Sequence, residues 1–418
     1  MKFTSRRDDM NKLRMDNIEQ LTNLYSALSQ YENVETSQFI QADSIKPYSF
    51  TKVDIANATG ASESVIQRIM DKMTEEGEYI AKDGRNWSML NRDQALTIMQ
   101  RIGIKSVQDR RLLNPSKHEV PVMLVNKNKG GVAKSTTALH LAVSSALDVK
   151  NNRRTLLIDG DIQGSLRHYL SLSQAESAFN SVSELISNNI HLSHEERLSE
   201  SNQSKFRQYL MEKVVLSSIV DNLWFIPSVL TDIEMTIAIA QELTSGTENS
   251  VERALTAFSD IVVNPLKSEF DFIIIDSGPA PDPLAYNLLY ASNHLMIPTT
   301  GREQDFRAYL QHIKFTTMLM QQVLPSDFKG LYSIRALITK HQKQENLEAT
   351  ANKILASGNS AYATRILESK KYEEAARVKV PLQILNTPRT SAMRDCLDLL
   401  ASLYSEVNSI ISNFEFHA

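Results

Sequence analysis

The sequence predicts a doubly wound, mostly parallel α/β sheet, and it predicts a small helical module ahead of that sheet. From about residue 113, short apolar runs alternate with helical stretches, the pattern of buried parallel strands joined by helices. The first run also leads into a loop rich in glycine and lysine that opens a helix. The strands expected from this pattern cover residues 122–126, 155–159, 272–276, 295–299, 334–339 and 382–385.

The composition is that of a globular protein with more than one domain. The chain has 418 residues, 42% hydrophobic and 22% charged, and a formal net charge of −4. No apolar run approaches the roughly 20 residues that a membrane span needs. The single cysteine, Cys396, excludes an intramolecular disulfide framework and a Cys-based metal site within one chain. We therefore expect a cytoplasmic protein without a membrane segment.

Three domains are expected: residues 1–46, 47–112 and 113–418. The first contains a predicted helix at 8–31 whose apolar residues recur every three or four positions. That apolar stripe fits packing within its own domain and fits a dimer contact equally well. Residues 171–255 are polar and mostly helical in pattern, and they are interpreted as insertion helices on the third domain.

The second domain has the outline of a winged helix-turn-helix. A helix near 51–58, a turn at 59–61 and a helix near 63–76 that starts after Ser62 are followed by a hairpin signal at Asp83-Gly84. The apolar residues expected to face inward are Ile55, Ala56, Val65, Ile69 and Met73. If the second helix enters a major groove, the DNA-facing residues are Ser64, Gln67, Arg68 and Lys72, with Arg85 in the hairpin.

A winged helix can also serve protein contact or dimerisation. The basic excess at 82–111, seven Lys and Arg against three Asp, favours DNA.

The loop after the first strand has the residues that a phosphate-binding loop needs. It runs Lys129, Gly130, Gly131, Val132, Ala133, Lys134, Ser135, Thr136. Glycines allow backbone N–H groups to approach phosphates, a lysine contacts the β- and γ-oxygens, and a hydroxyl binds Mg²⁺. The ordinary P-loop pattern is not met, because Asn128 and Ala133 stand where glycines belong. An additional lysine, Lys129, precedes the glycine pair.

Three aspartates follow predicted strands. Asp159 ends the run at 155–159, and Asp161 follows two residues later. Asp276 ends the run at 272–276. Open α/β sheets bind ligands at the carboxyl edge of their strands, and a buried strand ending in Asp is the Walker B arrangement that supports Mg²⁺. Each aspartate alone could be a helix N-cap, but the lysine-rich loop favours nucleotide binding.

In these motifs the chain resembles the ParA family of partition ATPases, part of the deviant-Walker group that includes MinD and the nitrogenase iron protein. The family pattern K-G-G-x-x-K-[ST] is met by Lys129 to Ser135, and D-x-D-x-Q by Asp159, Asp161 and Gln163. The Walker B position matches Asp276. The resemblance covers roughly residues 120–390, and the N-terminal modules resemble the long ParA subgroup, which also regulates its own operon.

The resemblance implies a magnesium-dependent ATPase with ATP/ADP as its nucleotides and slow intrinsic turnover. Lys134 would neutralise phosphate charge, Ser135 would bind Mg²⁺, and Asp159 with Asp276 would support it. Asp161 would orient the attacking water. Lys129 would reach across an ATP-sandwiched homodimer to the partner's nucleotide. Two positions depart from the usual family pattern: Ala133 stands where many relatives have glycine, and Ile162 stands between the second aspartate and the glutamine, where a proline is often found.

The implied partners are DNA, bound without sequence preference, and a ParB-type centromere-binding protein that stimulates hydrolysis, so a nucleoid-associated location is expected. A specific operator is also expected. The candidate surface for nonspecific DNA is the basic excess at 327–379, which includes Lys340, Lys343, Arg365, Lys370, Lys371, Arg377 and Lys379. The alternative is a nucleotide-switched transcriptional repressor without a segregation role. A MinD-like membrane cycle is disfavoured, because the C-terminal tail after Cys396 lacks Lys and Arg.

Overall fold

The computed structural model describes residues 19–23, 26, 44–46, 48–115, 118–162, 164, 166, 169, 180–356 and 360–417. The chain separates into two compact units, Met1–Ile45 and Lys46–Ala418. The helix predicted at 8–31 falls mostly outside the described residues, and so does Gln163 of the aspartate motif. The sections below concern the second unit.

The second unit is built on an eight-stranded sheet with the order β10-β9-β8-β3-β7-β4-β6-β5. All neighbouring strands are parallel except the edge pair β5–β6. This confirms the predicted mostly parallel α/β fold. The strands are β3 (Val122–Val125), β4 (Thr155–Gly160), β5 (Leu216–Ser217), β6 (Leu223–Ile226), β7 (Phe272–Ser277), β8 (His294–Thr299), β9 (Ser333–His341) and β10 (Ala361–Leu367).

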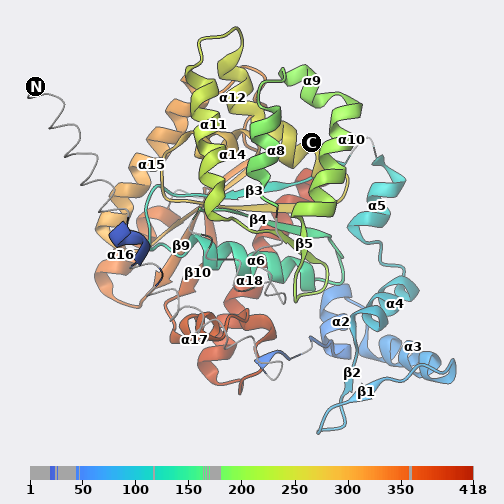
Figure 1. Cartoon of the computed structure of the whole chain (residues 1–418). Coiled ribbons are helices and arrows are strands. Elements are labelled where there is room, and N and C mark those ends of the chain that lie inside the picture. The colour runs from blue at the N-terminus through green and yellow to red at the C-terminus, as the bar shows by residue number, and fades with distance from the viewer. Residues whose placement is uncertain are drawn as a thin grey trace, which may run out of the picture. The chain divides into compact units, whose positions relative to one another are not determined.

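Helices cover both faces of this sheet. In Figure 1, α6 and α18 lie on one side of it, and α8, α11, α12 and α14 lie on the other. The helices are α6 (Lys134–Leu147), α8 (Val182–Asn189), α9 (His194–Leu198), α10 (Glu200–Tyr209), α11 (Ile233–Thr244), α12 (Ser250–Phe258), α13 (Asn264–Leu266), α14 (Pro283–Tyr290), α15 (Glu303–Gln322), α16 (Glu345–Leu355), α17 (Lys370–Val378) and α18 (Ser391–His417). Within the described ranges, no helix is long and apolar enough to cross a membrane.

Shorter helical turns complete this unit. They are the π-helical η3 (Leu210–Val214) and η5 (Ser259–Val263), and the 3-10 turns η4 (Leu230–Asp232) and η7 (Leu382–Ile384).

Two predictions about the sheet were wrong. Residues 382–385 were expected to form a strand, but they contain η7, which follows Pro381 and packs its buried Leu382 and Ile384 beside α6. The edge strand is β10 instead. Residues 171–255 were interpreted as helical insertions, but β6 inside them pairs with β4 in the central sheet. Its four-residue run is too short to stand out among polar helices by periodicity.

Residues 48–113 form three helices and a hairpin, followed by a connecting helix. The elements are α2 (Lys52–Thr59), α3 (Glu63–Glu75), β1 (Ala81–Lys82), β2 (Ser88–Met89), α4 (Arg92–Ile102) and α5 (Val107–Leu113). Thr51 forms a capping box with Asp54, and Gly60 ends α2 in the left-handed region with φ of 76°. These local signals explain why the chain turns between α2 and α3 where it does.

The inward face of α3 differs from the prediction by one position. Ile66, Met70 and Met73 are buried, whereas Val65 is 39% exposed and Ile69 is half-buried. Residues 66, 70 and 73 follow the i, i+4, i+7 spacing of one helix face, and this face starts one residue later than expected. The DNA-binding assignment of this module stays a prediction.

The module is fastened to the turn between α6 and β4. Val149 from that turn packs in the module's own hydrophobic cluster. Arg92 at the start of α4 donates to the Ala146 carbonyl at 2.7 Å and to Asn152 Oδ1 at 2.6 Å. The Val107 N–H donates to the Asn151 carbonyl at 2.8 Å. The module is therefore held at the C-terminal end of α6.

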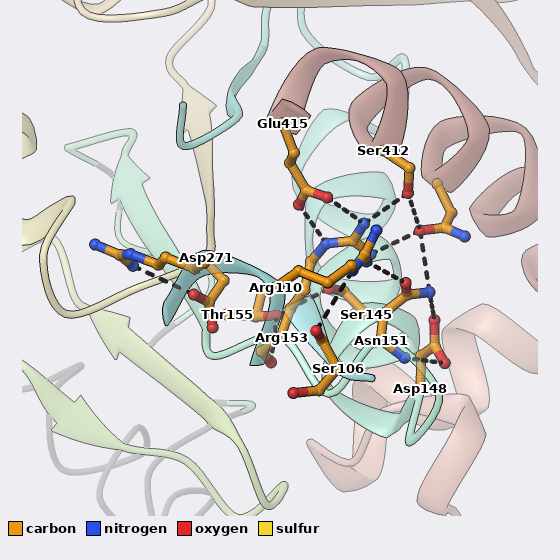
Figure 2. A network of polar contacts seen from close by, with 12 residues as sticks. Ser106, Arg110, Ser145, Asp148, Asn151, Arg153, Thr155, Asp271, Ser412 and Glu415 are labelled. Atoms are coloured by element: carbon orange, nitrogen blue, oxygen red, sulfur yellow. Dashed lines mark hydrogen bonds and ion pairs between the residues drawn. The ribbon is translucent and has the colours of Figure 1, made fainter. Parts of the chain in front are cut away.

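A polar network beside this contact joins α5, the start of β4 and the end of α18 (Figure 2). Arg153 and Glu415 form a fully buried ion pair, with Arg153 Nε at 2.6 Å from the carboxylate. Arg153 also donates to Ser412 Oγ at 2.9 Å. Arg110 of α5 donates to Asn151 Oδ1 at 3.3 Å. The central charges of this network, Arg153 and Glu415, are thus paired with each other, and the network holds the three segments together.

Candidate nucleotide-binding site

The phosphate-binding loop lies between β3 and α6, as predicted. Ala133 caps α6 in the left-handed region with φ of 62°, and Gly131 has φ of 77°. For an alanine this conformation is strained, so the residue at the position expected to be glycine carries a real backbone cost. The Thr339 hydroxyl near the end of β9 donates to the Val132 carbonyl at 2.9 Å, and this bond ties the backbone of the loop to the sheet.

Lys134 lies at the first position of α6 and is only 7% exposed. Its Nζ donates to the Lys129 carbonyl at 3.2 Å, so the side chain folds back over the loop. Burial lowers the pKa of Lys134, and Asp276 and Asp161 act in the opposite direction. Ser135 and Thr136 follow on the first turn of α6, both half-buried. The Lys134 ammonium and the N-terminus of α6 thus lie together at the loop, where both would favour a negatively charged group.

Asp159 and Asp276 lie side by side at the carboxyl edge of the sheet. They are register partners on β4 and β7, and both are buried. Asp159 accepts from the N–H groups of Asp161 at 3.1 Å and Leu166 at 3.3 Å. Among the residues that the structure describes, neither carboxylate oxygen of Asp276 has a hydrogen-bond partner. Two adjacent buried carboxylates favour a cation between them in addition to the nearby Lys134 ammonium.

The pKa values agree with this geometry. Burial raises the pKa of Asp159 to about 7, while the two backbone N–H groups lower it. Burial also raises the pKa of Asp276 well above its ordinary value, and Asp159 raises it further. A cation placed between these groups would stabilise the ionised form of both.

Gly160 is required between the two aspartates of the motif. A Cβ at this position would lie 2.8 Å from the Asp276 carbonyl oxygen and 3.0 Å from Leu288 Cδ1. The third carboxylate, Asp161, is half-buried and lies beside Gly278, where an added Cβ would be 3.6 Å from Asp161 Oδ1. The structure therefore gathers Lys134, Asp159, Asp161 and Asp276 at one edge.

Oxygen ligands of this kind suit a magnesium ion. Among the described residues, no three or more His, Cys, Asp or Glu side chains form a metal-binding group. Magnesium commonly binds through one or two protein carboxylates, with phosphates and water completing the shell. The unpartnered oxygens of Asp276 and the nearby Ser135 hydroxyl, which lowers the pKa of Asp276, fit that donor set.

Lys129 contacts a residue that the sequence did not indicate. Its Nζ pairs with Asp305 Oδ1, and the Thr300 hydroxyl donates to the other oxygen of that carboxylate. The Lys129 side chain is 36% exposed, whereas that of Asp305 is 8% exposed. Burial raises the pKa of Asp305, but the bonds from Lys129 and Thr300 outweigh it and hold the pKa below its ordinary value.

A second lysine lies behind this pair. Lys127 is fully buried, and its Nζ donates to Thr299 Oγ1 at 2.7 Å and to the Asp305 carbonyl at 2.9 Å. Burial lowers the pKa of Lys127 to about 8. Lys127 stands two residues after the end of β3 and one residue before Asn128. The signal for it in the sequence is a basic residue between the apolar strand and the glycine-rich loop.

A cavity of about 220 Å³ adjoins the loop on the side of β10. It is lined by residues from α6, β10 and α17, including Thr137, His140, Glu368 and Tyr372. His140 is fully buried with its Nδ1 2.7 Å from Gln383 Oε1, and burial lowers its pKa to about 4. This cavity combines an apolar wall with polar groups near the loop, as small-molecule pockets do.

The predicted DNA contacts lie far along the chain from this site. Ser64, Arg68 and Lys72 are exposed on α3, and Arg85 is exposed in the hairpin turn. Gln67 is half-buried, and its Nε2 donates to Asp71 at 2.9 Å.

The second basic set is partly neutralised. Arg365 pairs with Glu348 at 2.5 Å, and Lys371 pairs with Glu374 at 2.5 Å. Lys340, Lys343, Lys370 and Arg377 are exposed, and Lys340 also lines the 220 Å³ cavity. Lys379, half-buried, ends α17 in the left-handed region. The predicted surface is therefore smaller than the charge count suggested.

The chain is similar to several known proteins. A family model described as an AAA domain matches residues 120–329. Plasmid partition protein A of Escherichia coli is 23% identical over 310 residues, covering 72% of each chain. The sporulation initiation inhibitor protein Soj of Bacillus subtilis is 25% identical over 284 residues, covering 66% of this chain and 96% of Soj.

A solved structure named Partition Protein has the same fold, with a TM-score of 0.59 at 19% identity, covering 92% of this chain and 98% of that one. Because the family model matches half of the chain and the relatives are partition proteins, the chain belongs to the AAA-domain family and is a ParA-family ATPase.

Proposed function

We propose that this protein is an ATP-dependent DNA partition ATPase that dimerises on ATP, binds DNA without sequence preference and is stimulated by a ParB-type partner. One observation carries the proposal. Lys134, Asp159 and Asp276 converge at one edge of the sheet, while Lys129 leaves the same loop one-third exposed. The first three residues suit binding of ATP, and the exposure of the fourth supports a role outside its own subunit.

ATP would bind with its phosphates over the loop and its base in the adjoining cavity. Lys134 and the backbone N–H groups from Gly130 to Thr136 would hold the phosphates. The 220 Å³ cavity next to Thr137 and His140 has room for a purine base. The neutral His140 is suited to an uncharged ring, because its low pKa keeps it unprotonated near pH 7.

Magnesium, when bound, would neutralise charge developing on the transferred phosphoryl group. Ser135, Asp159 and Asp276 are the residues that would hold it. Asp161, which lies further out at the same edge, would orient the attacking water.

Dimerisation would exchange the partner of Lys129. In the structure this lysine pairs with Asp305 of its own chain. The triphosphate of the second subunit's ATP carries several negative charges and offers Lys129 a charge-assisted bond of the same kind as the carboxylate does. Binding of ATP in two facing copies would thus draw both Lys129 side chains across the interface. Because catalysis would then need both subunits, slow turnover of the isolated chain is expected.

DNA binding would use positively charged surfaces. The exposed Lys343, Lys370 and Arg377 are the candidates for nonspecific phosphate contact. Such binding should weaken steeply with salt. It would place the ATP-bound protein on the nucleoid until a ParB-type protein stimulates hydrolysis.

The decisive experiment measures ATP hydrolysis with and without nonspecific DNA and with the product of the neighbouring downstream gene. A partition ATPase should respond to the two together by more than the sum of the separate effects. A purely additive response would contradict the partition role.

A second function is favoured by the attachment of the α2–α4 module to the end of α6. Because α6 carries Lys134 at its other end, nucleotide binding could alter DNA binding by α3, and the protein would also repress its own operon. In the extreme case it would be a nucleotide-switched repressor without a segregation role. Tight binding of one operator in ADP, with no ATP-dependent binding to random DNA, would favour that alternative.

A further inference from the structure

Lys127 occupies a position that packing alone does not explain. Its ammonium group is completely buried, and within the described part of the chain its hydrogen bonds go to a hydroxyl and a backbone carbonyl, with the Tyr309 ring 5.8 Å away. A buried charge without a directly paired carboxylate is unfavourable, and an apolar side chain of similar size would fill the space at lower cost. We therefore expect the positive charge of Lys127 to have a function.

The neighbouring Asp305 carboxylate is the group on which this charge would act. Asp305 is buried and has two donors to its oxygens, Lys129 and Thr300. If Lys129 leaves, the carboxylate keeps a single neutral donor. A buried carboxylate that loses its ion-pair partner is strongly destabilised, so the exchange of Lys129 would be opposed unless another positive charge stays close.

We propose that Lys127 is this remaining charge, a positioning residue that keeps Asp305 and the first turn of α15 in place when Lys129 moves to the partner subunit's nucleotide. The inference rests on the proposed ATP-sandwiched dimer. Lys127 is suited to the task because it is anchored to Thr299 of β8 and to the Asp305 backbone, so it stays in place when the more exposed Lys129 leaves.

The electrostatics give the exchange a pH dependence. Asp305, Tyr309 and His312 of α15 face Lys127, as do Lys129 and Lys134 of the loop. Asp305 raises the pKa of Lys127, whereas both lysines lower it. Departure of Lys129 removes a repulsion, so the pKa of Lys127 rises and the exchange takes up a proton. This contribution is present below about pH 8 and is lost as the pH rises above that value.

The test compares dimer dissociation constants in ADP and in a non-hydrolysable ATP analogue by sedimentation velocity. The gain from ATP is defined as the dissociation constant in ADP divided by the dissociation constant in the ATP analogue. Interface contacts that are present in both nucleotide states cancel in this ratio. Lys127→Met should reduce the gain from ATP about tenfold, equivalent to about 1.4 kcal/mol. In an Asp305→Asn background the same substitution should change the gain less than about twofold, because no carboxylate remains to be stabilised.

Lys127→Gln separates charge from hydrogen bonding, since the amide can donate to Thr299 and Asp305 but carries no charge. It should behave like Lys127→Met. The gain from ATP in the unmodified protein should also fall between pH 7 and pH 9, and this fall should be absent in both variants. Thermal unfolding and binding of the analogue, which Lys127 does not contact, verify that each variant is folded.

An equal effect of Lys127→Met with and without the Asp305 carboxylate would overturn the proposal, as would a Lys127→Gln variant indistinguishable from the unmodified protein. Failure of the underlying dimer model has a different signature. In that case Lys129→Ala would keep the full gain from ATP, whatever the behaviour of Lys127.

Discussion

Lys129 Nζ and the Asp305 carboxylate form an ion pair that joins the phosphate-binding loop to the first turn of α15. The two residues are 176 positions apart in the chain. Lys129 is the lysine that is proposed to contact the nucleotide of the second subunit. In the structure its charge is instead paired with a carboxylate of its own subunit. The contact therefore competes with formation of the proposed dimer.

Asp305→Asn should strengthen the ATP-dependent dimer. Removing the carboxylate frees Lys129 in each of the two subunits. A partly exposed pair contributes up to about 1 kcal/mol, so the loss of two pairs should lower the dimer dissociation constant in an ATP analogue by up to about 30-fold. Sedimentation velocity measures this. The matched control is Glu303→Gln on the same helix turn, whose pair with Arg307 is exposed. An Asp305→Asn variant that dimerises more weakly would show that the carboxylate supports the interface.

Ala133→Gly should stabilise the protein. Alanine at φ of 62° is strained, and glycine removes that strain at the cost of a more flexible unfolded chain, so a gain of about 0.5–1 kcal/mol is expected. The melting temperature without nucleotide measures it. Ala138→Gly in the middle of α6 is the control and should destabilise by about 1 kcal/mol. A loss of stability in Ala133→Gly would mean that the left-handed turn carries no strain.

Lys127→Met should raise the melting temperature at pH 7, because it removes a buried charge. The pKa of Lys127 is about 8 in the folded state, below its ordinary value of 10.5. The unfolded chain therefore binds more protons between these values, and the unmodified protein gains stability as the pH rises from 8 to 10.5. The advantage of the variant should shrink over that range. Lys150→Met, at an exposed lysine, should show neither effect.

Two sets of DNA-facing residues should be separable by salt dependence and sequence preference. Replacing Lys370 and Arg377 with alanine should lower the slope of log affinity against log salt for random DNA by about 0.9 per contact removed. Replacing Arg68 and Lys72 should mainly weaken binding to an operator fragment. Fluorescence anisotropy with both DNAs measures this. Equal losses for both DNAs in both variants would contradict the assignment of separate surfaces.

The loop and its aspartates could be predicted because each lies within a few residues of a strand end. Asp305 and Lys127 could not be assigned, because their roles depend on β8 lying beside β3, and strand order is not visible in local periodicity. Gly160 could not be assigned either, since its constraint comes from the carbonyl of Asp276 on a neighbouring strand. The inward face of α3 differs from the prediction because the apolar residues come in adjacent pairs, Val65-Ile66 and Ile69-Met70, so two faces one residue apart fit the same helical spacing.

The central claim is that Lys129 joins two subunits through ATP, and its most direct test is Lys129→Ala beside Lys134→Ala. We predict that Lys129→Ala binds a labelled ATP analogue normally but loses the increase in dimer affinity that ATP gives over ADP. Lys134→Ala should lose nucleotide binding itself, together with hydrolysis. A Lys129→Ala protein that dimerises on the ATP analogue as strongly as the unmodified chain would contradict the account.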